Sequence, residues 1–191
     1  MQYKLTTPCT AEDLAPLKAG DTVLLSGVVY TARDQAHKRM LEALDKGEKL
    51  PFDLEGSAIY YVGPTPERPG EIIGSAGPTT SGRMDAMSPR LLDLGNKIMI
   101  GKGKRDAAVK EAVVRNGAVY LAALGGAGAL MAQSVKTLEV IAWPDLGCEA
   151  VRRLTVEDMP LTVILDAHGG DLYLSGPAAY KRQQGEEAKE L

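Results

Sequence analysis

One segment of the chain combines the side-chain types that bind anions. Residues 77–85 read Gly-Pro-Thr-Thr-Ser-Gly-Arg-Met-Asp, so hydroxyl groups and a guanidinium lie among residues that favour turns. Hydroxyl residues ahead of Met84 are typical of a helix N-cap, and a helix start favours negative charge. Arg83 can hold a carboxylate or phosphate through two parallel hydrogen bonds. The segment predicts an anion-binding turn, although an ordinary capped loop with a solvated arginine fits the same residues.

Two other segments place cations at predicted turns. Arg33 and His37 lie four residues apart on one face of a predicted helix, and Asp34 neighbours them. Residues 101–103, Gly-Lys-Gly, follow a predicted strand, where the backbone can approach a ligand closely. They lack the span and the Ser/Thr of a nucleoside-triphosphate loop. A solvated helix start with a structural histidine, and a surface lysine in a tight turn, are the alternative interpretations.

The elements that must position these side chains alternate between strand and helix. Apolar β-branched runs predict strands, and apolar residues at helical spacing predict helices between them. Strands are expected at 22–30, 58–62, 71–75, 97–100, 118–123, 137–143 and 162–166, and helices at 31–46, 88–95, 105–115, 129–133 and 149–153. Thr31 and Ser88 are the expected caps of the first two helices. The alternation predicts an α/β fold whose polar loops 31–37, 63–68, 77–85 and 101–105 converge at the carboxyl ends of strands.

Composition narrows the class of protein. The 191 residues carry a formal net charge of −3 with one Phe and one Trp, which argues against a nucleic-acid partner. The sequence has no run of eighteen apolar residues and no signal-peptide core at its start, so we expect no membrane partner and a cytoplasmic protein. Residues 1–178 are expected to form a single domain and 179–191 a charged tail. Cys9 and Cys148, far apart in the sequence, predict no metal or cluster site.

Three motifs in this order resemble a known family. Tyr30–Arg39 (YTARDQAHKR), residues 77–85 and Met99–Gly103 (MIGKG) are similar to the β subunit of iron–sulfur-dependent class I fumarate hydratases and L-tartrate dehydratases. In single-chain members this region is the carboxy-terminal domain. The resemblance covers roughly residues 5–175, including the glycine-rich segment at 125–130. It implies a swivelling β/β/α domain, with a mixed central sheet and flanking helices, packed against a larger α subunit.

The resemblance also implies where the chemistry lies. The α subunit would carry three cysteines that hold a [4Fe–4S] cluster, so this chain would be active only with that partner. Arg33 and Arg83 would clamp the carboxylates of a dicarboxylate substrate, and Thr79 would act as the base beside one of them. The expected catalytic residues are Thr79, Asp34 and His37, and the expected substrate-binding residues are Arg33, Arg83, Thr80 and Lys102. Asp34 and His37 would orient Arg33, whereas Lys104 and Arg105 would add charge beside the pocket and leave the contact of Lys102 open.

Two functions remain open at this point. The first is a hydro-lyase subunit, for the reversible hydration of fumarate to L-malate or the dehydration of tartrate to oxaloacetate. In both reactions negative charge builds on a carboxylate as the adjacent carbon loses its proton, so preorganised cations favour the transition state. The alternative is a non-catalytic module that binds a dicarboxylate or docks a partner. Homodimerisation is also possible, and residues 125–128 are one candidate contact.

Overall fold

The sheet is built around two long antiparallel strands, β2 and β7. The computed structural model describes residues 1–124 and 126–187. Seven strands form one mixed sheet: β1 (Gln2–Thr6), β2 (Thr22–Thr31), β3 (Ala58–Tyr60), β4 (Ile98–Gly101), β5 (Val119–Ala122), β6 (Val135–Ala142) and β7 (Val151–Leu165). From β2, the strands β3, β4 and β5 follow in parallel, and β5 then pairs antiparallel with β7. Because β7 also pairs with β2, these five strands close into a ring, while β1 and β6 extend it.

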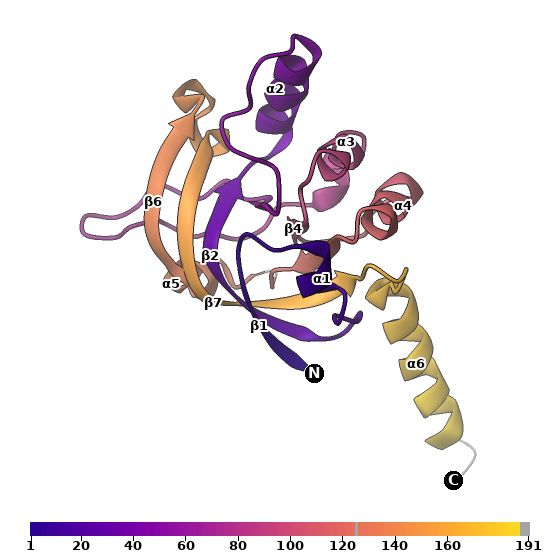
Figure 1. Cartoon of the computed structure of the whole chain (residues 1–191). Coiled ribbons are helices and arrows are strands. Elements are labelled where there is room, and N and C mark those ends of the chain that lie inside the picture. Colours follow the sequence, from indigo (N-terminus) through magenta and orange to yellow (C-terminus); the bar gives the residue numbers. More distant parts are fainter. Residues whose placement is uncertain (125, 188–191) are drawn as a thin grey trace.

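Helices cover the outer face of the parallel strands. The helical elements are α1 (Ala11–Leu14), α2 (Asp34–Asp45), η1 (Ser81–Met84), α3 (Ser88–Asp93), α4 (Ala107–Arg115), α5 (Gly128–Gln133), η2 (Pro144–Glu149) and α6 (Leu172–Glu187). Figure 1 shows α2, α3 and α4 side by side on one side of the sheet, and α6 extending away from it. Asp106 caps α4 by accepting a hydrogen bond from Val109 N, and Val109 and Val113 bury one face of that helix. The helices therefore seal a second hydrophobic core against β3, β4 and β5.

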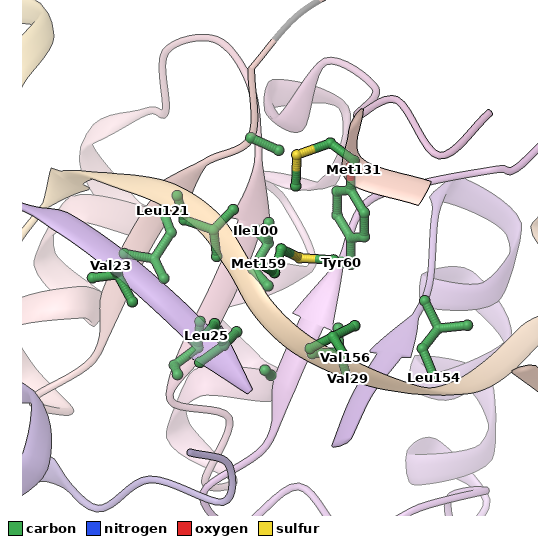
Figure 2. Packing of buried hydrophobic residues seen from close by; sticks show 14 of the residues in the cluster. Val23, Leu25, Val29, Tyr60, Ile100, Leu121, Met131, Leu154, Val156 and Met159 are labelled. Atoms are coloured by element: carbon green, nitrogen blue, oxygen red, sulfur yellow. The ribbon is translucent and has the colours of Figure 1, made fainter. Parts of the chain in front are cut away.

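The first core lies inside the ring of strands. Alternate residues of β2, including Val23, Leu25 and Val29, are buried there and meet Leu154 and Met159 of β7 (Figure 2). Alternation of this kind follows from the two-residue period of a strand. The core thus holds the carboxyl ends of β2, β3 and β4 in fixed relative positions, and the polar loops begin at those ends.

The predicted α/β class, with a mixed central sheet and flanking helices, is confirmed. Ser88, the predicted cap of the helix at 88–95, is instead the first residue of α3, and its hydroxyl donates to Met84 O at 2.9 Å. Two predicted elements are wrong. Residues 71–75 form no strand, and prolines 64, 66 and 69 in the preceding loop cannot donate to a ladder. Residues 149–153 are not a helix, because 151–156 pair with β2 on one side and β6 on the other, which extends the predicted strand 162–166 back to Val151.

The C-terminal part of the described chain is helical. α6 spans Leu172–Glu187 and so crosses the predicted domain boundary at 178, which stays a prediction. Within residues 1–124 and 126–187, no helix combines the length and the apolar character needed to cross a membrane.

Candidate active site

Three polar turns meet at one edge of the sheet. The turn after β2 and the η1 segment are joined by Arg83, whose Nε donates to Asp34 Oδ1 at 2.7 Å. The η1 segment and the turn after β4 are joined by a parallel bridge between Thr80 and Lys102 and by a 2.8 Å hydrogen bond from Ser81 N to Lys102 O. β2 and β4 belong to the same parallel run of strands, so their carboxyl ends lie at one edge. The structure therefore brings together the turns that the sequence motifs singled out.

Arg33 is held in place at the start of α2. Its side chain is 18% exposed, and its Nη2 lies 3.6 Å from Glu149 Oε1 while its Nε lies 3.9 Å from Asp34 Oδ2. A Cβ atom at Gly63 would lie 2.5 Å from Arg33 Nη1, so the guanidinium packs directly on that glycine. The guanidinium is consequently confined between two carboxylates and a stretch of backbone.

Glu149 is a part of this site that the sequence motifs did not indicate. It ends η2, and its Oε2 accepts a 2.8 Å hydrogen bond from Gln35 N in the first turn of α2. The carboxylate thus satisfies a free N–H of the helix start, where negative charge is favourable. The predicted cap, Thr31, is the last residue of β2 instead, and its hydroxyl donates to Ala150 O at 3.2 Å. No local pattern identifies Glu149, because it lies more than one hundred residues from α2 in the sequence.

His37 is buried beneath the first turn. Its Nδ1 lies 3.0 Å from Arg33 O, and because a carbonyl can only accept, Nδ1 carries the hydrogen and Nε2 is a bare acceptor. Burial lowers the pKa of His37 to about 4, so the ring is neutral at neutral pH. In the described part of the chain, the buried side-chain atoms without a hydrogen-bond partner are Arg33 Nε, Asp34 Oδ2 and His37 Nε2. Buried polar atoms without a hydrogen-bond partner are rare in folded proteins, and here all three belong to the turn that follows β2.

The second turn exposes Arg83 and Thr80 and half buries Thr79. Thr79 N donates to Tyr61 O at 2.8 Å, which fixes its backbone, and the side chain of Arg83 is 52% exposed. The predicted helix N-cap is wrong, because η1 is a single turn of 3₁₀ helix and the side chain of Thr80 makes no capping bond. At this turn the group available to an anion is therefore the guanidinium of Arg83 and not a capped helix start.

The third turn presents two lysines to solvent and buries an arginine: Lys102 and Lys104 are exposed, whereas Arg105 is buried. Lys102 is exposed directly after β4. Arg105, expected to add charge to the pocket, is buried instead and donates to Asp85 Oδ1 at 2.6 Å. Its guanidinium also lies over the rings of Tyr61 and Tyr120 at 5.3 and 5.0 Å. Arg105 therefore belongs to the core, and of the two exposed lysines Lys102 is the one that directly follows the strand.

The cysteines do not fit an iron–sulfur cluster. Cys9 is buried, which raises the pKa of its thiol to about 11, whereas Cys148 is exposed. Within the residues that the structure describes, no group of three or more His, Cys, Asp or Glu side chains lies where it could hold a metal ion. An iron–sulfur cluster is held mainly by several thiolates, so these residues offer no such ligand set.

The hollows beside the loop at 64–75 do not include the three cations. Hollows of about 410 and 560 Å³ flank this loop, and neither is lined by Arg33, Arg83 or Lys102.

The glycine-rich segment packs against the end of the loop at 64–75. Gly128 O accepts a hydrogen bond from Ala76 N at 3.0 Å, and a Cβ atom at Gly128 would lie 2.2 Å from Ser75 Oγ. Residue 125 of that segment lies outside the described residues. Gly128 thus supports the segment that leads into Thr79, and the predicted homodimer contact stays untested.

Comparison with known proteins gives a consistent family. The model of the Fumarase C-terminus family matches residues 1–176. A putative L(+)-tartrate dehydratase subunit beta of Methanocaldococcus jannaschii is 42% identical over 170 residues, which cover 86% of this chain and 87% of the relative. The L(+)-tartrate dehydratase subunit beta of Escherichia coli is 34% identical, with 90% and 87% covered.

Some relatives are much longer than this chain and match it over only part of their own length. Fumarate hydratase 2 of Leishmania major is 39% identical over 168 residues, which cover 85% of this chain but 29% of the relative. The chain therefore spans less than a third of the fumarate hydratases that it matches. The match over residues 1–176 identifies this chain as a member of the Fumarase C-terminus family.

Proposed function

We propose that this chain is the β subunit of a hydro-lyase that acts on a dicarboxylate, with fumarate and L-malate or tartrate and oxaloacetate as the substrate pairs. The observation that carries the proposal is the meeting of Arg33, Arg83 and Lys102 at one sheet edge, with Thr79 in the middle turn. The two tartrate dehydratase β subunits, matched over 87% of their length, support this class of reaction. A β subunit implies an α subunit, and we assign the [4Fe–4S] cluster to that partner because the residues described in this chain do not fit it.

The arginines are suited to bind the two carboxylates of such a substrate. Arg83 uses its Nε for Asp34, and its two terminal nitrogens make no hydrogen bond with any described residue. Those two nitrogens can form the paired hydrogen bonds that a carboxylate accepts. As the adjacent carbon loses its proton, charge builds on that carboxylate, and a guanidinium already held in place stabilises it without reorganisation.

Thr79 is our candidate for the group that takes this proton. A threonine hydroxyl is a weak base at its ordinary pKa, so a neighbouring group must take up or share its hydrogen. Within the described part of this chain the Thr79 hydroxyl has no hydrogen-bond partner, and we place the proton acceptor on the α subunit. Asp34 orients Arg83 through the 2.7 Å bond, and His37 orients Arg33 through its carbonyl. We assign Thr80 and Lys102 to substrate binding.

Anaerobic reconstitution with the α subunit tests this proposal. The complex is assayed on fumarate, L-malate and both tartrates, first with the wild-type chain and then with Arg83→Ala. We expect kcat/KM to fall by about 10² to 10⁴ in the variant. Arg90→Ala is the matched control, because Arg90 also pairs with an aspartate and its side chain is 46% exposed, but it lies outside the three turns. Near-normal turnover by Arg83→Ala would refute the carboxylate clamp, and dicarboxylate binding without turnover would favour a non-catalytic module.

A further inference from the structure

The peptide group on each side of Lys102 is bonded to one buried serine. Ser81 N donates to Lys102 O at 2.8 Å, and Lys102 N donates to Ser81 Oγ at 3.0 Å. Ser81 is fully buried, and a Cβ atom added at Gly101 would lie 2.0 Å from its Oγ. The serine therefore packs against the backbone of the turn and determines where Lys102 leaves the strand.

Tyr120 extends this contact to the other side of the turn. The tyrosine is fully buried, and its Oη lies 2.9 Å from Ser81 Oγ and 3.0 Å from Gly103 O. A phenol has one hydrogen and a carbonyl can only accept, so Tyr120 donates to Gly103 and the serine hydroxyl donates to Tyr120. The hydrogen bonds then run in one direction, from Lys102 N–H through two hydroxyls to the carbonyl of Gly103. Burial raises the pKa of Tyr120 above its ordinary value, so the phenol keeps the hydrogen that this arrangement needs.

The far end of the turn is also bonded. Gly103 has φ +86°, a left-handed conformation that favours glycine, and its N–H donates to Tyr173 Oη at 3.2 Å. By contrast, the side chain of Lys102 is exposed, and its ammonium has no hydrogen-bond or salt-bridge partner among the described residues. A backbone held at this many points beneath a free ammonium group is what the placement of a ligand-binding cation requires.

We propose that Tyr120 is a positioning residue whose hydroxyl, through Ser81 and Gly103, holds the 101–103 turn so that Lys102 meets the substrate carboxylate. This inference rests on the proposed function, because it takes Lys102 to be a substrate contact. The ring of Tyr120 packs against Arg105 as well, so Tyr120→Phe removes the hydroxyl and leaves the ring in place. The effect of that variant should therefore report on the hydrogen bonds that run from Lys102 N–H through Ser81 and Tyr120 to Gly103 O.

A double-mutant cycle in the reconstituted complex tests whether Tyr120 acts through Lys102. A displacement of about 1 Å at a catalytic group costs on the order of 10²-fold, so we expect Tyr120→Phe to lower kcat/KM roughly tenfold. In the Lys102→Ala background the same substitution should change kcat/KM less than about twofold, because the residue that it positions is gone. Equal losses in both backgrounds would show a merely structural role and overturn the proposal.

Tyr61→Phe is the matched control. Tyr61 is equally buried, its ring also lies against Arg105, and its hydroxyl also bonds to a buried serine, Ser88, at 3.2 Å. It does not touch the 101–103 turn through its hydroxyl. We expect the same small effect of Tyr61→Phe with and without Lys102. A tenfold loss that depends on Lys102 in this control would overturn the assignment to Tyr120.

Amide hydrogen exchange of the full chain tests the turn without any assay of activity. Loss of the Tyr120 hydroxyl should speed exchange at Lys102 and Gly103 roughly tenfold, the effect of about one lost hydrogen bond, and Tyr61→Phe should not. Unchanged exchange in Tyr120→Phe overturns the proposal. Absence of wild-type turnover on fumarate, L-malate and both tartrates overturns the proposed function instead, and the exchange result still decides whether Tyr120 holds the turn.

Discussion

The surface with the three cationic turns and the core next to it each contain an arginine–aspartate pair of almost the same length. Arg83 Nε lies 2.7 Å from Asp34 on the surface, with its side chain 52% exposed, and Arg105 Nε lies 2.6 Å from Asp85 in the core, with its side chain 0% exposed. Arg105 also donates to Ser88 and Met99 and lies against two aromatic rings, whereas Arg83 keeps its terminal nitrogens free of described partners.

The difference lies in what burial leaves available. A buried charge needs partners for its hydrogen-bonding groups, so the core pair is a structural element with nothing left for a ligand. An exposed pair loses little hydration and contributes little to the free energy of unfolding, so its arginine can exchange partners. Arg33, 18% exposed and 3.6 Å from Glu149, lies between these two cases. The different burial of the three arginines thus predicts different losses of stability and activity when each arginine or its partner is substituted.

Removal of Arg105 should have the largest effect on stability. Arg105→Met leaves the carboxylate of Asp85 without its cation, and we expect the free energy of unfolding to fall by about 3–5 kcal/mol. Urea denaturation of the chain measures this loss. Arg115→Met is the control, because Arg115 pairs with Asp93 at 2.9 Å but its side chain is 51% exposed. A loss below about 1 kcal/mol for Arg105→Met would remove the distinction between core and surface pairs.

His37 should make stability depend on pH. Its pKa is lowered from 6.5 to about 4 by burial, with the charge of Arg105 as a smaller cause, so the unfolded state binds the proton more readily. The stabilisation is fully present above pH 6.5 and is lost as pH falls towards 4, by about 3 kcal/mol in all. Unfolding free energies measured across this range should lose that slope in His37→Gln.

The other histidine provides the control for this pH dependence. His168 lies outside the site, and its Nε2 contacts Ala15 O at 2.7 Å. The slope should persist in His168→Gln. An unchanged slope in His37→Gln would show that the buried ring is not the group that titrates.

Glu149 should have an intermediate effect. Glu149→Gln removes the charge that faces Arg33 and the start of α2, and we expect a loss of about 1 kcal/mol in unfolding free energy. In the complex, kcat/KM should fall roughly tenfold, because Arg33 loses one of its two carboxylates. Glu157→Gln is the control, since Glu157 lies at the same 3.6 Å from Lys136 on an exposed surface. Equal behaviour of the two variants would refute a role of Glu149 at the site.

Arg83 should contribute least to stability. Because its pair with Asp34 is half exposed, Arg83→Gln should change the unfolding free energy by less than about 1 kcal/mol. The same variant should lose activity in the complex by about 10² to 10⁴. Denaturation and turnover measured on one preparation provide both values. A stability loss as large as that of Arg105→Met would mean that the surface pair is structural as well.

Local sequence was sufficient for much of the fold and for the choice of turns. The apolar runs at 22–30 and 97–100 and the helix ended by Asn116 and Gly117 follow from short-range patterns, and the structure confirms them. The motifs around Arg33 and Lys102 lie directly after β2 and β4, which the parallel pairing through β3 brings to one edge. The motif around Arg83 follows no strand directly and is joined to the other two through Asp34 and Lys102. The roles of these residues in substrate binding stay predictions.

Contacts between residues far apart in the sequence decided the remaining parts of the fold and of the site. Residues 149–153 have a weak helical pattern of their own, and only the two neighbouring strands make 151–156 part of β7. Glu149 and Tyr120 carry no sequence signal for the site, because each acts on residues that the fold brings near from elsewhere in the chain. Ser81 lies in the 77–85 motif, but only the structure shows that it is bonded to Lys102.

The sequence by itself determined the class of fold, the family and the three cation-bearing turns, because these depend on residue type, spacing and the order of motifs. Only the tertiary structure decided which arginine faces the solvent and which is buried. Arg83 and Arg105 are of the same residue type and lie in similar polar turns. The charge of each is available to a ligand only to the extent that neighbouring elements leave it exposed.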